Sequence, residues 1–129
     1  IVTAGLNHIL DTQFHASTQV TTWYIGLKGA GTPAAADTMS SHSAWSELTG
    51  YAGDRKAWTE GAASSGSMTN SSSVDFTINA SATIAGAFLN TAATGTSGTL
   101  YGVVDFSSSR AVISGDTLQV TVTVTAASA

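Results

Sequence analysis

Residues 117–125 alternate strictly between polar and apolar side chains, and no other feature of the chain restricts its fold as strongly. The segment reads Thr-Leu-Gln-Val-Thr-Val-Thr-Val-Thr, which places one leucine and three valines on a single side. A period of two is that of a β-strand with one buried face. Slipping the register by one residue would bury five polar side chains, so the register is fixed. We expect the polar face to be solvated, with packing against a partner subunit as the alternative.

Several other segments have the composition or the alternation of short strands. In residues 73–79 the side chains of Val74, Phe76 and Ile78 fall on one face, and residues 83–90 are apolar on both faces. The remaining strand-like segments are residues 19–27, 55–60, 99–106 and 110–113, with turns expected at 107–109 and 114–116. Short strands at this spacing, without βαβ alternation, predict a mainly β fold. We expect an antiparallel β-sandwich, either a jelly roll or an immunoglobulin-like sandwich.

One helix is expected, over residues 3–15. Thr3 is a candidate N-cap, and the apolar side chains at helical spacing should face the core; they are Leu6, Ile9, Leu10 and Phe14. The opposite stripe carries His8, Asp11 and His15 at spacings of three and four, as a metal site on a helix could. Because this stripe lies opposite the apolar face, we interpret it as the solvated side of the helix and predict no metal.

The chain of 129 residues is expected to form a single domain, residues 1–129, with a long irregular loop region over residues 29–55. A helical turn is possible at residues 43–48. Aromatic residues in or near the loop region, with one from the strand before it, are the candidate contact residues: Trp23, Trp45, Tyr51 and Trp58. Packing in the core, contact with another protein and stacking on a sugar ring are the three alternatives for the last three. Trp23 and Tyr24 point to opposite faces of their strand, so at most one of them enters the core, and the other is covered by the helix, covered by a neighbouring subunit, or exposed.

The surface is expected to be neutral and rich in hydroxyl groups. Charged residues are 9% of the chain, hydrophobic residues 43%, and the formal net charge is −4. Such a surface can be buried against another protein without desolvating many ions, which favours a component of an assembly. The basic residues are too scattered to bind nucleic acid; they are Lys28, Arg55, Lys56 and Arg110. No run is apolar enough for a membrane helix, and the absence of cysteine excludes disulfides and thiolate sites.

No residue pattern indicates catalysis or a cofactor. Ser41 and His42 are adjacent in the sequence, whereas a catalytic pair is normally assembled from distant segments. Acidic residues in or beside the loop region show no spacing that favours acid–base chemistry; they are Asp37, Glu47, Asp54 and Glu60. We therefore expect a protein that is not an enzyme.

The order of several segments resembles small structural proteins of tailed bacteriophages. The segments are Asp-Thr-Gln-Phe-His at 11–15, Thr-Thr-Trp-Tyr-Ile-Gly-Leu at 21–27, Asp-Thr-Met-Ser-Ser-His at 37–42, Trp-Ser-Glu-Leu at 45–48 and Ser-Gly-Asp-Thr-Leu-Gln-Val-Thr at 114–121. Within that class we favour a capsid decoration (cement) protein. The resemblance implies a homo-oligomer, with a trimer favoured, that binds the major capsid protein at the capsid surface after assembly in the host cytoplasm. The alternative is a tail or fibre component, or an adhesin-like module that binds carbohydrate.

Overall fold

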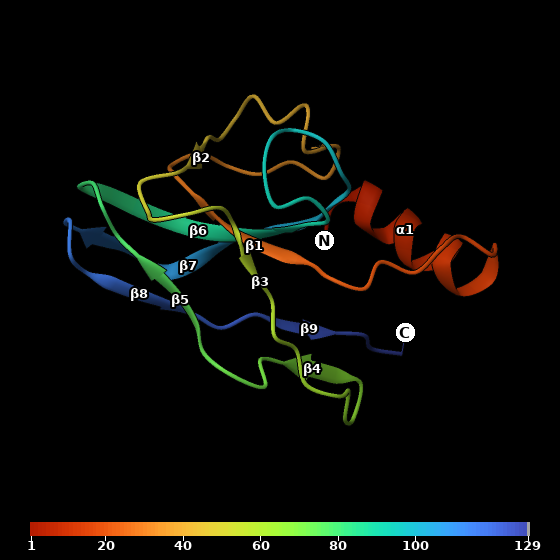
Figure 1. Ribbon diagram of the computed structural model, residues 1–129. Helices are drawn as coiled ribbons and strands as arrows, with labels where there is room; N and C mark the ends of the chain where they lie inside the picture. The colour runs from red at the N-terminus through yellow and green to blue at the C-terminus, as the bar shows by residue number, and fades with distance from the viewer. Residues whose placement is uncertain (129) are drawn as a thin grey trace.

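Strands β1, β6 and β7 form the larger of two sheet layers in the computed structural model, which describes residues 1–128 (Figure 1). β1 (Tyr24–Lys28) pairs antiparallel with β6 (Ala82–Asn90), which pairs antiparallel with β7 (Leu100–Val112). The other edge of β1 is shared by β2 (Glu47–Leu48) and β3 (Lys56–Ala57), also antiparallel. The expected strand at residues 19–27 therefore begins only at Tyr24, and residues 43–48 end in a strand rather than a helical turn.

The second layer consists of two short antiparallel pairs. β5 (Val74–Thr77) pairs with β8 (Thr117–Val120), and β4 (Ser67–Thr69) pairs with β9 (Thr123–Thr125). The core lies between the layers, and its larger cluster joins side chains of β1, β5, β6 and β8, including Ile25, Phe76, Ile84 and Val120. The expected antiparallel β-sandwich is confirmed, as is the inward face made by Val74, Phe76 and Ile78.

The C-terminal alternation is confirmed, but residues 117–125 do not form one continuous strand. The segment pairs first with β5 and then, after Thr121 and Val122, with β4. Asn70 fills the break between the two pairs: its side-chain amide donates to the carbonyl of Val120 (2.9 Å) and its carbonyl accepts the N–H of Val122 (3.0 Å). One side chain thus supplies both a donor and an acceptor where backbone pairing is interrupted.

β7 runs through the turn that we expected at residues 107–109, so that expectation was wrong. The partners on β6 are Ile84 opposite Arg110 and Gly86 opposite Asp105. The four residues 106–109 therefore face the single residue 85, and the excess length is absorbed as an irregularity within an extended strand. Serine-rich sequence is typical of a turn, and here it occurs at an irregularity within a strand. The sequence pattern alone does not distinguish these two structures.

Helix α1 spans Thr3–Phe14 and follows an N-cap at Val2 that provides no side-chain hydrogen bond. The predicted cap at Thr3 is wrong, because Thr3 is the first helical residue and its N–H donates to the carbonyl of Ala35 (2.8 Å). At the other end, the N–H of His15 donates to the carbonyl of Asp11 (2.9 Å). The helix extends from one end of the sandwich, beside the first layer (Figure 1).

The orientation of α1 departs in part from the one that we predicted, because Asp11 and His15 are exposed as expected but His8 is not. Gly5 is the buried residue of the helix, and a Cβ at this position would overlap the carbonyl of Tyr101 on β7. His8, expected on the solvated side, packs edge-on against the ring of Trp23 at 5.2 Å between centroids. Leu6, Leu10 and Phe14 are exposed instead, whereas Ile9 lines the space between α1 and the sandwich. The helix backbone approaches the sheet closely at this glycine, because no side chain separates the two backbones there.

Candidate interaction surfaces

Three of the four aromatic residues that we proposed as contacts lie inside the chain. Trp45, Tyr51 and Trp58 are buried, with Tyr51 and Trp58 in the larger core cluster and Trp45 in a smaller one beside Phe88. Trp23 is half-buried and remains at the surface between α1 and the sheet. Of the candidates, Trp23 is the one whose ring is only half-buried, and Trp58, although buried, also borders the groove described below.

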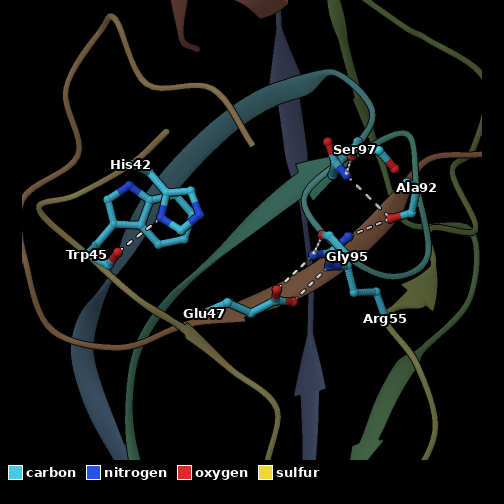
Figure 2. A network of polar contacts seen from close by, with 8 residues as sticks. His42, Trp45, Glu47, Arg55, Ala92, Gly95 and Ser97 are labelled. Atoms are coloured by element: carbon cyan, nitrogen blue, oxygen red, sulfur yellow. Dashed lines mark hydrogen bonds and ion pairs between the residues drawn. The ribbon is translucent and has the colours of Figure 1, made fainter. Parts of the chain in front are cut away.

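The loop region over residues 29–55 is held by polar contacts of its own. Asp37 accepts hydrogen bonds from the indole N–H of Trp45 (3.0 Å) and from the N–H of Ala34 (2.8 Å). His42 stacks on Trp45 with 3.9 Å between ring centroids, and its Nδ1 bonds the carbonyl of Trp45 at 3.0 Å (Figure 2). The His42 ring is therefore occupied in fixing the loop, and the adjacent Ser41 takes part in a turn with Thr38.

Arg55 ties this loop region to residues 91–99, as Figure 2 shows. Its guanidinium makes a bidentate pair with Glu47, both distances being 2.7 Å, and donates to the carbonyls of Ala92 (2.8 Å) and Gly95 (2.5 Å). The hydrogen bonds to Glu47 raise the pKa of Arg55. The guanidinium is planar and permanently charged, and its four hydrogen bonds all go to groups of the chain itself. Arg55 therefore acts as a structural clamp and leaves no charge for an external ligand.

A second cation is also used internally. Lys28, fully buried on β1, donates from Nζ to the carbonyls of Gly29 (2.9 Å) and Gly31 (2.7 Å) and to the carboxylate of Asp105 (2.7 Å). With Lys28 and Arg55 both inside, half of the four basic residues are unavailable to a polyanion. This arrangement agrees with the interpretation that the surface is neutral.

The acidic residues do not converge. Asp37 caps its loop, Glu47 pairs with Arg55, and Asp54 and Glu60 are exposed. Within residues 1–128 no group of three or more histidine or acidic side chains lies close enough to hold a metal ion. No helix in the described part of the chain is long and apolar enough to cross a membrane.

The side of α1 that points away from the sandwich is an exposed apolar surface. Leu6, Leu10 and Phe14 follow one another at intervals of four residues, and their exposed fractions are 47%, 55% and 80%. We call these three residues the outer helix face. A leucine exposed alone is ordinary, whereas an exposed apolar row along one helix is unusual on a protein surface.

A groove of about 660 Å³ lies between the inner side of α1 and the sandwich. Its walls come from α1, from residues 19–23, and from the segments in or around β3, β4, β6, β7 and β9. The lining combines apolar and aromatic side chains with amides, hydroxyls and one carboxylate. We call it the helix groove. A second, smaller hollow of about 290 Å³ lies along β7 and β9 and is lined mostly by valines and small residues.

The polar groups of this sandwich hold its own loops together, and its most notable surface is the apolar row on one helix. These are features of an assembly component. Comparison with known families gives the assignment: residues 2–127 match the family described as "Podophage GP4 fiber I protein gp80". The chain belongs to this family, and it is therefore a structural protein of a phage virion. A comparison with curated proteins finds no match.

The sequence alone did not reveal either surface. The outer helix face was visible as a pattern of apolar residues, but we assigned that pattern to the core. The helix groove is built from seven separate segments, so no local spacing in the sequence predicts it. The one available signal was Gly5, whose missing side chain allows the inner side of α1 to approach the sheet.

Proposed function

We propose that this protein is a non-enzymatic structural subunit of a phage tail or fibre, and not a capsid decoration protein. The observation that carries the proposal is the family match over residues 2–127, because the description of that family names a fibre. The fold suits the role. Loops clamped by Arg55 and Asp37 give a rigid unit, and a surface with few charges can be buried repeatedly along a fibre.

We further propose that the subunit forms a homo-oligomer through the outer helix face. Burying Leu6, Leu10 and Phe14 removes apolar surface from water at roughly 25 cal/mol per Å², which favours association. The occupant of this face is a second copy, since the same chain also carries the valine-lined hollow along β7 and β9 that can receive apolar side chains. A net charge of only −4 keeps repulsion between copies small.

Labelling of intact virions tests the location. A phage whose own copy of this gene carries an epitope tag is imaged with gold-labelled antibody. We expect gold at the tail or on fibres attached to it, whereas gold distributed evenly over the capsid would support decoration and overturn the fibre assignment. Binding of purified protein to shells of the major capsid protein alone would likewise count against it.

Molar mass in solution tests the oligomer. Light scattering after size exclusion should give a multiple of the 13.0 kDa chain, and the same measurement decides whether that multiple is the trimer expected from the resemblance. Leu10→Ser with Phe14→Ser should give monomers that retain the native circular dichroism spectrum. The control is Ile113→Ser, an exposed apolar residue elsewhere. A strictly monomeric native protein, or an oligomer unaffected by the double variant, would refute the proposed interface.

A further inference from the structure

We propose that the helix groove is a binding site for a neutral saccharide. The inference does not rest on the fibre assignment or on the oligomer, because the groove is complete within one chain. Its volume, about 660 Å³, lies within the usual range for sites that enclose small ligands. The chemistry of its lining indicates the class of ligand.

The floor of the groove is aromatic and apolar. Trp23 meets the ring of Tyr101 edge-on at 5.6 Å between centroids, and Trp58, Leu89 and Val124 continue the apolar surface. The indole N–H of Trp58 is already bound to Asn70 (2.7 Å), so this ring contributes carbon surface alone. Burial raises the pKa of Tyr101, which keeps its phenol protonated and able to donate a hydrogen bond. Sugar rings place their C–H faces against surfaces of this kind.

The rim of the groove is polar and uncommitted. Gln13 and Gln19 are exposed, as is the carboxylate of Glu60. In the described part of the chain none of these three side chains makes a hydrogen bond or an ion pair, unlike Asn70, Asp37 and Arg55, which are fully engaged. Amides donate and accept at once, and a carboxylate accepts two hydrogen bonds. Ring hydroxyls, which both donate and accept, are complementary to such a set.

The charges around the groove select a neutral ligand. No lysine or arginine lines it, and two of the four basic side chains of the protein are buried in internal contacts. Phosphorylated or carboxylated sugars would meet Glu60 with no lysine or arginine to compensate, and repulsion would disfavour them. His8 also lines the groove, but its ring packs edge-on against Trp23. A purely apolar ligand would leave the polar rim desolvated without partners. A polyhydroxylated ring with one apolar face avoids both penalties.

The experiment is a binding assay of the purified protein on an array of neutral oligosaccharides of glucose, galactose, mannose, rhamnose and N-acetylglucosamine, with sialylated and sulfated glycans on the same array. We expect binding to at least one neutral probe and none to the anionic ones. The best neutral probe is then titrated in solution while tryptophan fluorescence is followed. Absence of binding to every neutral probe at millimolar concentration, or a preference for anionic ones, would overturn the proposal.

Substitutions locate the site. Trp23→Ala should weaken the affinity for the neutral probe by on the order of tenfold or more, through loss of the aromatic floor. Because Trp23 also packs against the core, Glu60→Gln and Gln19→Ala provide independent tests at exposed positions, each expected to weaken affinity severalfold. Ile113→Ser, far from the lining, is the control and should bind as the native protein does.

The remaining outcomes separate this proposal from the previous one. The monomeric variant Leu10→Ser with Phe14→Ser should still bind the probe, since its substitutions lie outside the groove lining. Binding that survives Trp23→Ala, Glu60→Gln and Gln19→Ala alike would place the saccharide elsewhere and refute the groove. If a peptide from another virion protein protected the rim residues while no saccharide bound, the saccharide proposal would be refuted in favour of a protein partner.

Discussion

At the scale of single residues, Asn70 joins the two halves of the second layer. Its side chain bonds Val120, Val122 and the indole of Trp58 at 2.9, 3.0 and 2.7 Å. We predict that Asn70→Ala lowers the free energy of unfolding by about 2–4 kcal/mol, because it leaves several partly buried groups without partners. Urea denaturation measures this loss. Asn79→Ala, at an exposed position, is the matched control and should change stability by less than about 0.5 kcal/mol.

Tyr51 gives the chain a dependence on alkaline pH. Burial, followed by the charge of Glu47, raises the pKa of its phenol to about 12 from the ordinary value of 10.0. The unfolded chain loses this proton from pH 10, whereas the folded chain holds it up to about pH 12. The stabilisation is therefore complete below pH 10 and declines as the pH rises toward 12, by up to about 2 kcal/mol.

The measurement for Tyr51 is the difference in unfolding free energy between the native protein and Tyr51→Phe as a function of pH. The phenylalanine variant removes the ionisation and keeps the ring against Phe76, which lies edge-on at 4.8 Å. The difference should be constant below pH 10 and should shift in favour of the variant above it. Parallel curves up to pH 12 would show that Tyr51 does not carry the effect.

At the scale of elements, α1 depends on a single close approach. Gly5→Ala ordinarily favours a helix by up to about 1 kcal/mol, but here the added methyl overlaps the carbonyl of Tyr101. We predict a net destabilisation of about 1–3 kcal/mol and detachment of the helix while the sandwich persists. Limited proteolysis should then cut residues 15–22 faster than in the native protein. Asn7→Ala, on the exposed side, should leave the cleavage rate unchanged.

Sequence reasoning succeeded where a pattern had one structural meaning. The alternation in residues 73–79 and 117–125 fixed which side chains enter the core, because a strand has only two faces. Sequence reasoning failed where the interpretation of an apolar pattern depends on which other surface packs against that helix or strand. The apolar row of α1 fits a core or an interface equally well, and the sequence gives no account of how much core the strands already fill. The break after Val120 depends on the distant Asn70, which no local pattern connects to it.

At the scale of the whole molecule, scarcity of charge determines how assembly responds to salt. Charged residues make up 9% of the chain, and two of the basic ones are satisfied internally. We predict that the homo-oligomer persists between 0.05 and 1 M sodium chloride, since apolar contacts are not screened. Light scattering at both concentrations is the measurement. Dissociation at high salt would mean that ion pairs, and not the outer helix face, hold the copies together.

Helix α1 takes part in both proposals, from opposite sides: its inner side is a wall of the helix groove, and its outer side is the proposed seam between copies. A contact that restricts the motion of α1 on one side also restricts it on the other. Saccharide binding and association of copies are therefore thermodynamically linked. An assembled copy should hold a saccharide more tightly than a lone one, and a saturating saccharide should shift the monomer–oligomer equilibrium by the same factor. A subunit with this linkage would bind its target weakly while free and firmly once built into the particle.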